Sequence, residues 1–242
     1  MVESLLTIVP RYGLANRMRA LASGVILGET MGFRICFYWE KNELCNCSFT
    51  KLFDSDLIQV ESPLMGTTDD QVFFSKEEMI GGVIRIGDDE REKNLVVESF
   101  NPFMLESVGR EDFQEMLSRK IREVFSPSTE VRSKLIDLPE KCVGVHVRRR
   151  DSVPSRREST DAAFLVSMDK ALVEDGETCF FLSTDSNEVK RVMTEKYGPS
   201  KIITREIDSR RSSDSGIIDA LVDMFMLSKT KKVLTMIIRF RI

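Results

Sequence analysis

The sequence has only one histidine and one tryptophan among its 242 residues. Its cysteines are also few, an odd five, and some of them fall within predicted strands. Buried reduced thiols and a reducing compartment are therefore expected rather than a disulfide framework. Cys45 and Cys47 form a C-x-C pair without a second pair at metal-ligand spacing. No metal site is predicted.

Long apolar runs are absent. No stretch of about 18 uncharged apolar residues occurs, so a membrane span is not expected. The apolar run Leu5–Val9 is too short for the core of a signal peptide, and Pro10 and Arg11 follow it directly. These absences predict a protein without secretion signal or anchor, located in the cytoplasm.

Neither sign of charge dominates. The net charge of -4 and the pI near 5.4 give no reason to expect nucleic acid or an anionic membrane as a partner. With 42% hydrophobic and 31% charged residues, the composition is that of a globular chain long enough for one large or two modest α/β domains. Any anion-binding site must then be local.

The first forty residues have the pattern of a strand, a turn, a helix and a second strand. Leu5–Val9 predicts a buried strand, and the turn PRYGLAN leads into a helix that Gly32 ends. Arg34–Trp39 predicts the second strand. Apolar residues recur along the helix at spacings of three and four, at Met18, Leu21, Ala22, Val25 and Ile26. A parallel sheet is implied.

Residues 41–90 predict loops, short strands and one short helix. A strand over Leu95–Phe100 and a helix over Glu111–Phe125 follow. Ser126-Pro127-Ser128 stops that helix and Pro139 precedes a new strand, so residues 126–140 are predicted to connect two domains. The N-terminal domain is accordingly placed at residues 1–125.

The second half alternates strands with helices, which predicts a doubly wound α/β domain over residues 141–242. The expected strands are Cys142–Val147, Thr178–Ser183, Lys201–Thr204 and Lys232–Thr235. The expected helices are Asp161–Glu174, Asn187–Lys196 and Ile217–Ser228.

The segment VGVHVRRRD, Val143 to Asp151, places basic residues at the carboxyl end of an apolar strand. Gly144, His146 and, if the strand continues, Arg148 share the face opposite the valines. Ligands of open α/β sheets bind at this edge, and arginine pairs with phosphate oxygens in bidentate geometry, so a diphosphate is the expected ligand. The alternative is a solvated charge run. Three consecutive arginines directly after a buried strand, in an acidic chain, favour the anion site.

The same segment is similar to the H-x-R-R-x-D motif of the α-1,6-fucosyltransferases, including the rhizobial nodulation enzymes, and of the protein O-fucosyltransferases. Three further segments resemble motifs of this superfamily in the right order. They are GLANRMRALASGVILGETMGFRICFYW with G-x-x-N-R, FLSTDSNEVKRV with T-D, and DALVDMFMLSKTKKVLT with D-x-x-x-L-S. The resemblance covers both ends of the chain and leaves residues 41–95 unmatched.

This resemblance implies a GT-B-like fold with two Rossmann-like domains facing across a cleft. The N-terminal domain would bind the acceptor and the C-terminal domain the nucleotide-sugar. It implies transfer of fucose from GDP-fucose to a glycan or another hydroxyl acceptor without a metal. The GDP-sugar is a co-substrate, and no other cofactor is expected.

The motif also implies roles for individual residues. Arg148 and Arg149 would hold the pyrophosphate and, as the catalytic residues, stabilise charge on the departing GDP. His146 would bind the nucleotide-sugar as a hydrogen-bond donor rather than act as a general base. Asp151 would position the arginines or meet the acceptor, or else form a simple salt bridge. The sequence does not identify a catalytic base.

Four further residues are assigned from the other motifs, each with a structural alternative. Asp185 would accept hydrogen bonds from the base or ribose, or cap the next helix, and Ser186 stands where the family often has a second acidic residue. Asp223, on a helix with apolar neighbours, would need a partner such as the arginines or the donor, or would lie on an exposed helix face. Asn16 and Arg17 would face the cleft from the N-terminal domain, and Asn16 has helix capping as its alternative.

After Thr235 the family continues with a serine-rich turn and a helix, whereas here an apolar stretch ends at Ile242. A truncated C-terminal domain is therefore expected, because a doubly wound sheet needs a covering helix on each face. This truncation supports a second hypothesis, that the protein is a truncated, non-catalytic homologue that binds nucleotide or glycan. RNA binding is a third hypothesis, which the acidic balance disfavours.

Overall fold

A computed structural model describes residues 4–63, 71–75, 79, 82–149, 160–208 and 210–235. The chain divides into two compact units. One comprises the residues up to Val131 together with Arg210–Ile218, and the other comprises Arg132–Ser209 and the residues from Asp219 onward. The change of unit after Val131 falls inside the segment 126–140 predicted as the connection. The return of Arg210–Ile218 to the first unit has no counterpart in the predicted division, whose limits stay a prediction.

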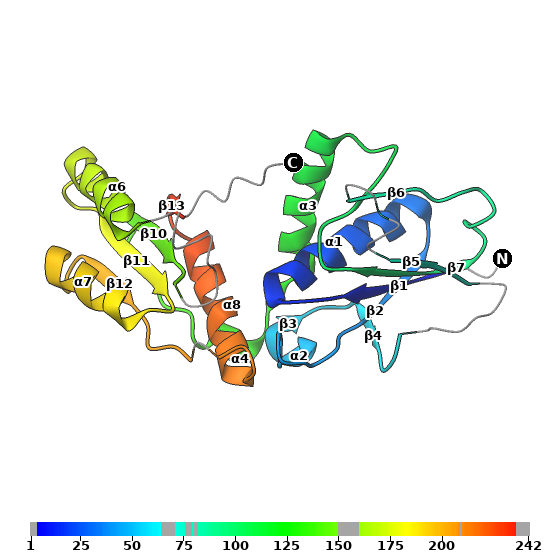
Figure 1. Cartoon of the computed structure of the whole chain (residues 1–242), viewed down its shortest axis with the longest axis horizontal. Helices are drawn as coiled ribbons and strands as arrows, with labels where there is room; N and C mark the ends of the chain where they lie inside the picture. Colours follow the sequence, from blue (N-terminus) through cyan, green and yellow to red (C-terminus); the bar gives the residue numbers. More distant parts are fainter. Residues whose placement is uncertain are drawn as a thin grey trace. The chain divides into compact units, whose positions relative to one another are not determined.

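The first unit is built on a parallel sheet of order β4-β2-β1-β7-β5 (Figure 1). The predicted β-α-β arrangement is confirmed, because α1 (Leu14–Met31) connects the parallel pair β1 and β2. The strands are β1 (Leu5–Pro10), β2 (Arg34–Tyr38), β4 (Ile58–Val60), β5 (Gln71–Phe74) and β7 (Asn94–Ser99).

Glycines allow α1 to pack closely on this sheet. A Cβ atom on Gly24 would lie 2.2 Å from Cδ1 of Ile8, and one on Gly28 would lie 2.4 Å from Cγ1 of Ile35. The helix ends at Gly32, as predicted, in the left-handed conformation with φ 78°. Such a conformation favours glycine, which has no Cβ to clash with the carbonyl oxygen.

The segment predicted as short elements completes the core of the first unit. It contains α2 (Phe49–Leu52), β3 (Phe53–Asp54) and β6 (Val83–Ile84). Neighbouring rings of an aromatic cluster have centroids 4.6 to 6.4 Å apart, and the cluster consists of Phe37, Trp39, Phe49, Phe53 and Phe125. The remaining elements are α3 (Arg110–Val124) and the short elements β8 (Met104–Leu105), β9 (Ser126–Pro127) and α4 (Thr129–Arg132).

The second unit contains a parallel sheet of order β12-β11-β10-β13. Each predicted strand and helix of this half is present, with ends that differ by at most three residues. The strands are β10 (Cys142–Val147), β11 (Cys179–Thr184), β12 (Ile202–Thr204) and β13 (Val233–Leu234). The helices are α6 (Asp161–Glu174), α7 (Asn187–Tyr197) and α8 (Asp214–Ser228).

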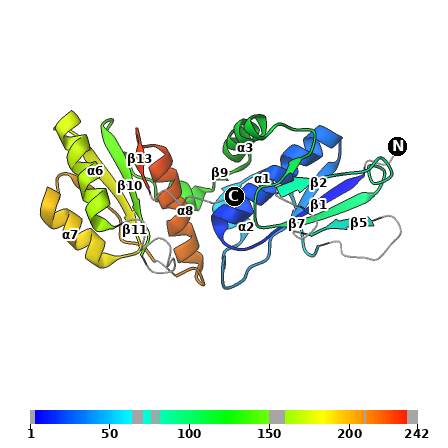
Figure 2. The ribbon, with the colours of Figure 1, turned by 45° about the horizontal axis from the view of Figure 1, so that its top comes forward.

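Both faces of this sheet carry helices. Figures 1 and 2 show α6 and α7 on one side of the strands and α8 on the other. The β10 valines and Phe180 pack with Phe164 and Met168 of α6 in one core cluster. On the opposite face, a Cβ atom on Gly144 would lie 2.9 Å from Cδ2 of Leu227, so glycine admits α8 at close range. The face of β10 that bears His146 is therefore covered by α8.

The five cysteines are free and buried, which confirms the predicted thiols. Within the described ranges, every helix is too short or too polar to cross a membrane. The C-terminal residues 236–242, on which the expected truncation rests, lie outside the described part of the chain.

The packing of α1 on β1 predicts that Gly24→Ala destabilises the protein. Overpacking against Ile8 is expected to lower the free energy of unfolding by about 1–3 kcal/mol, although alanine favours a helix by about 1 kcal/mol. Gly176→Ala is the control, because no heavy atom lies within 4 Å of its added Cβ. Urea unfolding measures both variants. Equal stability of the two would contradict close packing at Gly24.

Candidate functional site

The carboxyl ends of β10 and β11 bring together several of the predicted site residues. Arg148 and Arg149 follow β10, Asp185 follows β11, and the two strands pair in parallel with Val147 beside Thr184. The backbone N–H of Arg149 donates a hydrogen bond of 2.7 Å to Oδ1 of Asp185. Residues 36 apart in the sequence thus meet at one edge of the sheet, where parallel sheets place ligands.

Asp185 orders the chain after β10 and does not cap the following helix. The N-cap of α7 is Ser186, whose hydroxyl accepts a hydrogen bond from the backbone N–H of Val189. The capping alternative for Asp185 is therefore wrong. Serine at this position satisfies an N–H group at the helix start that would otherwise lack a partner.

Arg149 forms an ion pair that the sequence did not reveal. Its Nε and Nη2 atoms donate to Oδ1 of Asp161, the first residue of α6, at 3.2 and 2.5 Å. The guanidinium carbon lies 5.9 Å from the centroid of the Phe164 ring. Since a phosphate would use the same N–H groups, an anionic ligand at Arg149 would compete with Asp161.

Asp223 is a buried carboxylate on α8, 6% exposed. Its Oδ1 atom accepts a hydrogen bond of 2.8 Å from Nη1 of Arg205, and Ser183 is a second hydrogen-bond partner. Burial raises the pKa of Asp223, and both hydrogen bonds oppose that rise. The exposed-face alternative is wrong, and the ionic partner of Asp223 is Arg205.

His146, the single histidine, lies half-buried on β10 among these charges. Burial lowers the pKa of its imidazole and the charge of Arg148 adds to this effect, whereas Asp223 and Asp185 oppose it. The imidazole is thus neutral at neutral pH and can donate one hydrogen bond while accepting another. Five of the predicted residues thus lie together at this strand end, namely His146, Arg148, Arg149, Asp185 and Asp223.

Arg205 is the centre of a network that the sequence analysis missed. It follows β12, and its Nη2 atom donates to Oδ1 of Asp219 at 3.1 Å. Asp219 also accepts from Nζ of Lys134 at 3.2 Å and from the backbone N–H of Asp208 at 2.9 Å. A single arginine after a short strand is a weak signal. Only the fold shows that it faces two buried carboxylates of α8.

Asn16 and Arg17 lie within α1 of the first unit. The N-cap of α1 is Gly13, so helix capping by Asn16 is wrong, and Asn16 instead accepts a hydrogen bond from Arg19. Arg17 has no exposed surface. Its guanidinium donates to the carbonyl oxygens of Tyr12 and Glu40 and to the side chain of Asn42, and it lies over the ring of Trp39. Arg17 therefore holds together the segments that follow β1 and β2. Its predicted role towards a ligand stays a prediction.

Arg150 and Asp151 lie outside the described residues. Among the residues that are described, no group of three or more histidine, cysteine, aspartate and glutamate side chains could hold a metal ion. The charged side chains of the site are guanidinium groups and carboxylates, which suit an anionic ligand with hydrogen-bond donors.

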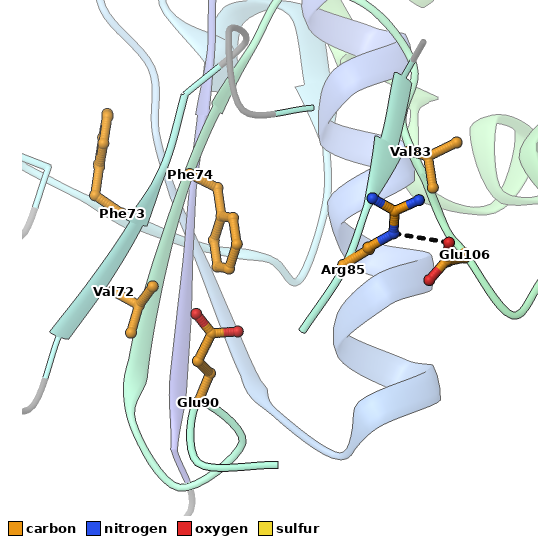
Figure 3. Close-up of a pocket in the computed structure, with 7 residues that line it drawn as sticks. All are labelled: Val72, Phe73, Phe74, Val83, Arg85, Glu90 and Glu106. Atoms are coloured by element: carbon orange, nitrogen blue, oxygen red, sulfur yellow. Dashed lines mark hydrogen bonds and ion pairs between the residues drawn. The ribbon is translucent and has the colours of Figure 1, made fainter. Parts of the chain in front are cut away.

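A hollow of about 400 Å³ lies elsewhere in the first unit (Figure 3). Side chains of β5 and β6 line it together with a salt bridge of 2.7 Å between Arg85 and Glu106. Its described lining consists of Val72, Phe73, Phe74, Val83, Arg85, Glu90 and Glu106. None of these is a predicted site residue.

The environment of His146 predicts a titration midpoint below 6.5, which NMR can measure without assignment because the chain has one imidazole. The unfolded chain takes up this proton first as the pH falls, so stability should decrease from about pH 6.5 down to the folded-state pKa. Urea unfolding across this range should show a weaker pH dependence in His146→Gln. A midpoint at or above 6.5 would contradict the buried environment.

No protein-family model and no curated protein matches the chain. Solved structures do match it. The fucosyltransferase NodZ from Bradyrhizobium is 17% identical, with a TM-score of 0.65 over 96% of this chain and 88% of that chain. A NodZ α-1,6-fucosyltransferase soaked with GDP-fucose is 18% identical, with a TM-score of 0.61 over 96% and 87%. A mutant of Arabidopsis thaliana FUT1 in complex with GDP is 12% identical, with a TM-score of 0.62 over 96% and 65%.

At 12–18% identity these likenesses show a shared fold. They agree with the fold that the resemblance of four short motifs implied. The chain shares the α/β fold of these solved fucosyltransferases.

Proposed function

We propose that the protein is a glycosyltransferase that transfers fucose from GDP-fucose to a hydroxyl group of a glycan or another acceptor. The main support is the grouping of His146, Arg148, Arg149, Asp185 and Asp223 around the carboxyl ends of two neighbouring parallel strands. Structures with the same fold include complexes with GDP-fucose and with GDP. Residues 141–242 are proposed as the nucleotide-sugar domain and residues 1–125 as the acceptor domain.

Arg148 and Arg149 are proposed to bind the diphosphate. When the bond between the sugar and the diphosphate breaks, negative charge accumulates on the departing GDP, and fixed guanidinium groups stabilise it. Arg149 would exchange Asp161 for phosphate oxygens in this step. Since these groups neutralise the diphosphate themselves, a divalent metal is not needed in this mechanism.

The carboxylates are proposed to recognise the nucleoside. Asp185 and Asp223 can accept hydrogen bonds from ribose hydroxyls or from the N–H groups of a base. Guanine presents more donors in one plane than uracil does, so carboxylates at this site favour GDP over UDP. Asp151, together with Asn16 and Arg17, is proposed to contribute to the donor and acceptor sites on the strength of the motifs alone.

A second candidate is a homologue that binds nucleotide or glycan without turnover. The ion pair between Arg149 and Asp161 favours it, because an arginine that keeps this partner is withheld from the departing phosphate. The two candidates differ in a direct assay. Release of GDP from GDP-fucose supports transfer, whereas GDP binding without release supports the non-catalytic homologue.

Nucleotide selectivity tests the donor assignment. GDP is expected to raise the melting temperature more than UDP, since a ligand at a hundredfold excess over Kd stabilises the folded state by about 2.7 kcal/mol. The shift with GDP is expected to persist in excess EDTA. Equal shifts with both nucleotides, or no shift with either, would reject the assignment, and loss of the shift on chelation would reject metal independence.

Arg148→Lys tests the diphosphate contact. Lysine keeps the charge but lacks the planar fork, so the substitution is expected to weaken GDP binding by about 1.5–3 kcal/mol, the range for a hydrogen bond to a charged group. Arg150→Lys is the matched control, because the family motif leaves that position variable. Calorimetry gives both dissociation constants, and melting curves report folding. A larger loss in Arg150→Lys than in Arg148→Lys would contradict the residue assignment.

A further inference from the structure

In the second unit, the buried carboxylates of α8 form a connected network with an arginine at the edge of the sheet. Asp219 and Asp223 lie about one turn apart on α8, and each is 6% exposed. Arg205 donates to both, through Nη2 to Asp219 and through Nη1 to Asp223. Its own side chain is 12% exposed, so this fork is held in a largely dry environment.

The two carboxylates differ in the groups that stabilise their negative charge. Asp219 has Lys134 and the backbone N–H of Asp208 as further partners. Asp223 has Arg205 as its ionic partner and the hydroxyl of Ser183 as a further hydrogen-bond partner. A buried carboxylate needs a counter-charge to stay ionised, because low polarity favours its neutral form. The ionisation of Asp223 therefore depends on Arg205 more than that of Asp219 does.

Arg205 is itself fixed by the fold. Its carbonyl oxygen accepts a hydrogen bond of 2.6 Å from Nζ of Lys190 on α7, so its backbone is tied to the helix on the opposite face of the sheet. The charged and titratable groups around Asp223 include Arg205 after β12, Asp219 on its own helix and the imidazole of His146 on β10. Only the guanidinium is both fixed and permanently positive.

We propose that Arg205 is a positioning residue of the candidate site, which keeps the Asp223 carboxylate ionised and directed towards the ligand. This inference rests on the proposed function, since GDP is the ligand that Asp223 would meet. Arg205 lies outside the segments that resemble family motifs. The observation that supports its role is its pair of contacts with α8.

The test is the pH dependence of GDP affinity, measured by calorimetry on the full chain. In Arg205→Gln the Asp223 carboxyl is expected to protonate as the pH falls. Between about pH 8 and about pH 5.5, GDP affinity should fall about tenfold more than in the wild type, because affinity falls about tenfold for each pH unit below the pKa of one required carboxylate. Protonation of the GDP phosphate is common to all variants and cancels in this comparison.

Matched double variants identify the carboxyl responsible. The additional pH dependence should disappear in Arg205→Gln/Asp223→Asn and persist in Arg205→Gln/Asp219→Asn. The midpoint of the single imidazole resonance, followed in each variant, separates the contribution of His146. A loss of affinity that is equal at both pH values, or that disappears with Asp219→Asn instead, would overturn the inference. Arg191→Gln is the control for the loss of one positive charge, because Arg191 is an exposed, ion-paired arginine on α7.

Two further measurements keep the result decisive. If Arg205→Gln does not fold, Arg205→Lys replaces it, and an additional loss of about threefold at the lower pH is expected from loss of the fork. If Arg205→Lys shows no additional loss of GDP affinity at the lower pH, the proposal is overturned.

If the wild type binds no GDP, the proposed function fails, and the ¹³C carboxyl resonance of Asp223 decides the inference instead. Its midpoint should be higher in Arg205→Gln, and an unchanged midpoint would overturn it.

Discussion

Charge neutralisation at the carboxyl edge of the second sheet is the constraint on which the candidate site depends. Within the described part of the chain, Arg149 pairs there with Asp161, and Arg205 pairs with both Asp219 and Asp223. Lys134 also pairs with Asp219, and Asp185 accepts a hydrogen bond from the backbone N–H of Arg149. Because a buried charge without a partner is costly, removing one member exposes the others to that cost. A diphosphate that binds here would displace a carboxylate from its cationic partner. It would not occupy a positive patch that lacks counter-charges.

The packing of β10 makes this balance possible. Gly144 lets α8 approach the sheet, and the next residue on the same face is His146. Close approach brings Asp223 over the strand end, where its charge raises the pKa of the imidazole while burial lowers it. The valines on the other face bind the same strand to α6 and α7. One strand thus joins the core to the ionisable groups.

The first unit also combines glycines that admit a helix to its sheet with a buried arginine, but there the arginine holds backbone segments together. Gly24 and Gly28 bring α1 onto the sheet, and the buried Arg17 on that helix donates to two carbonyl oxygens. A guanidinium can satisfy several backbone acceptors at once because its donors are fixed in a plane. The motif that suggested a ligand contact at Arg17 therefore also encodes the local architecture after β1.

The sequence alone determined the order and type of most elements. Alternating valines in β10, apolar residues at helical spacing in α1 and a glycine at position 32 are local signals, since strand and helix periods depend on neighbours along the chain. The same patterns placed His146, Arg148, Arg149 and Asp185 at the ends of two strands. The resemblance of four short motifs implied the α/β fold that the chain shares with the solved fucosyltransferases.

Only the tertiary structure decided the partners of the charged side chains. Asp223 pairs with Arg205, 18 residues away, and Arg149 pairs with Asp161 on α6. Capping was the structural alternative for Asn16 and Asp185, based on residue type, yet Gly13 and Ser186 hold the N-cap positions. An ion pair or a cap requires a distance of about 3 Å between particular atoms, and that distance depends on how whole elements pack. Periodicity in the sequence specifies which face a residue takes, whereas packing specifies what it meets there.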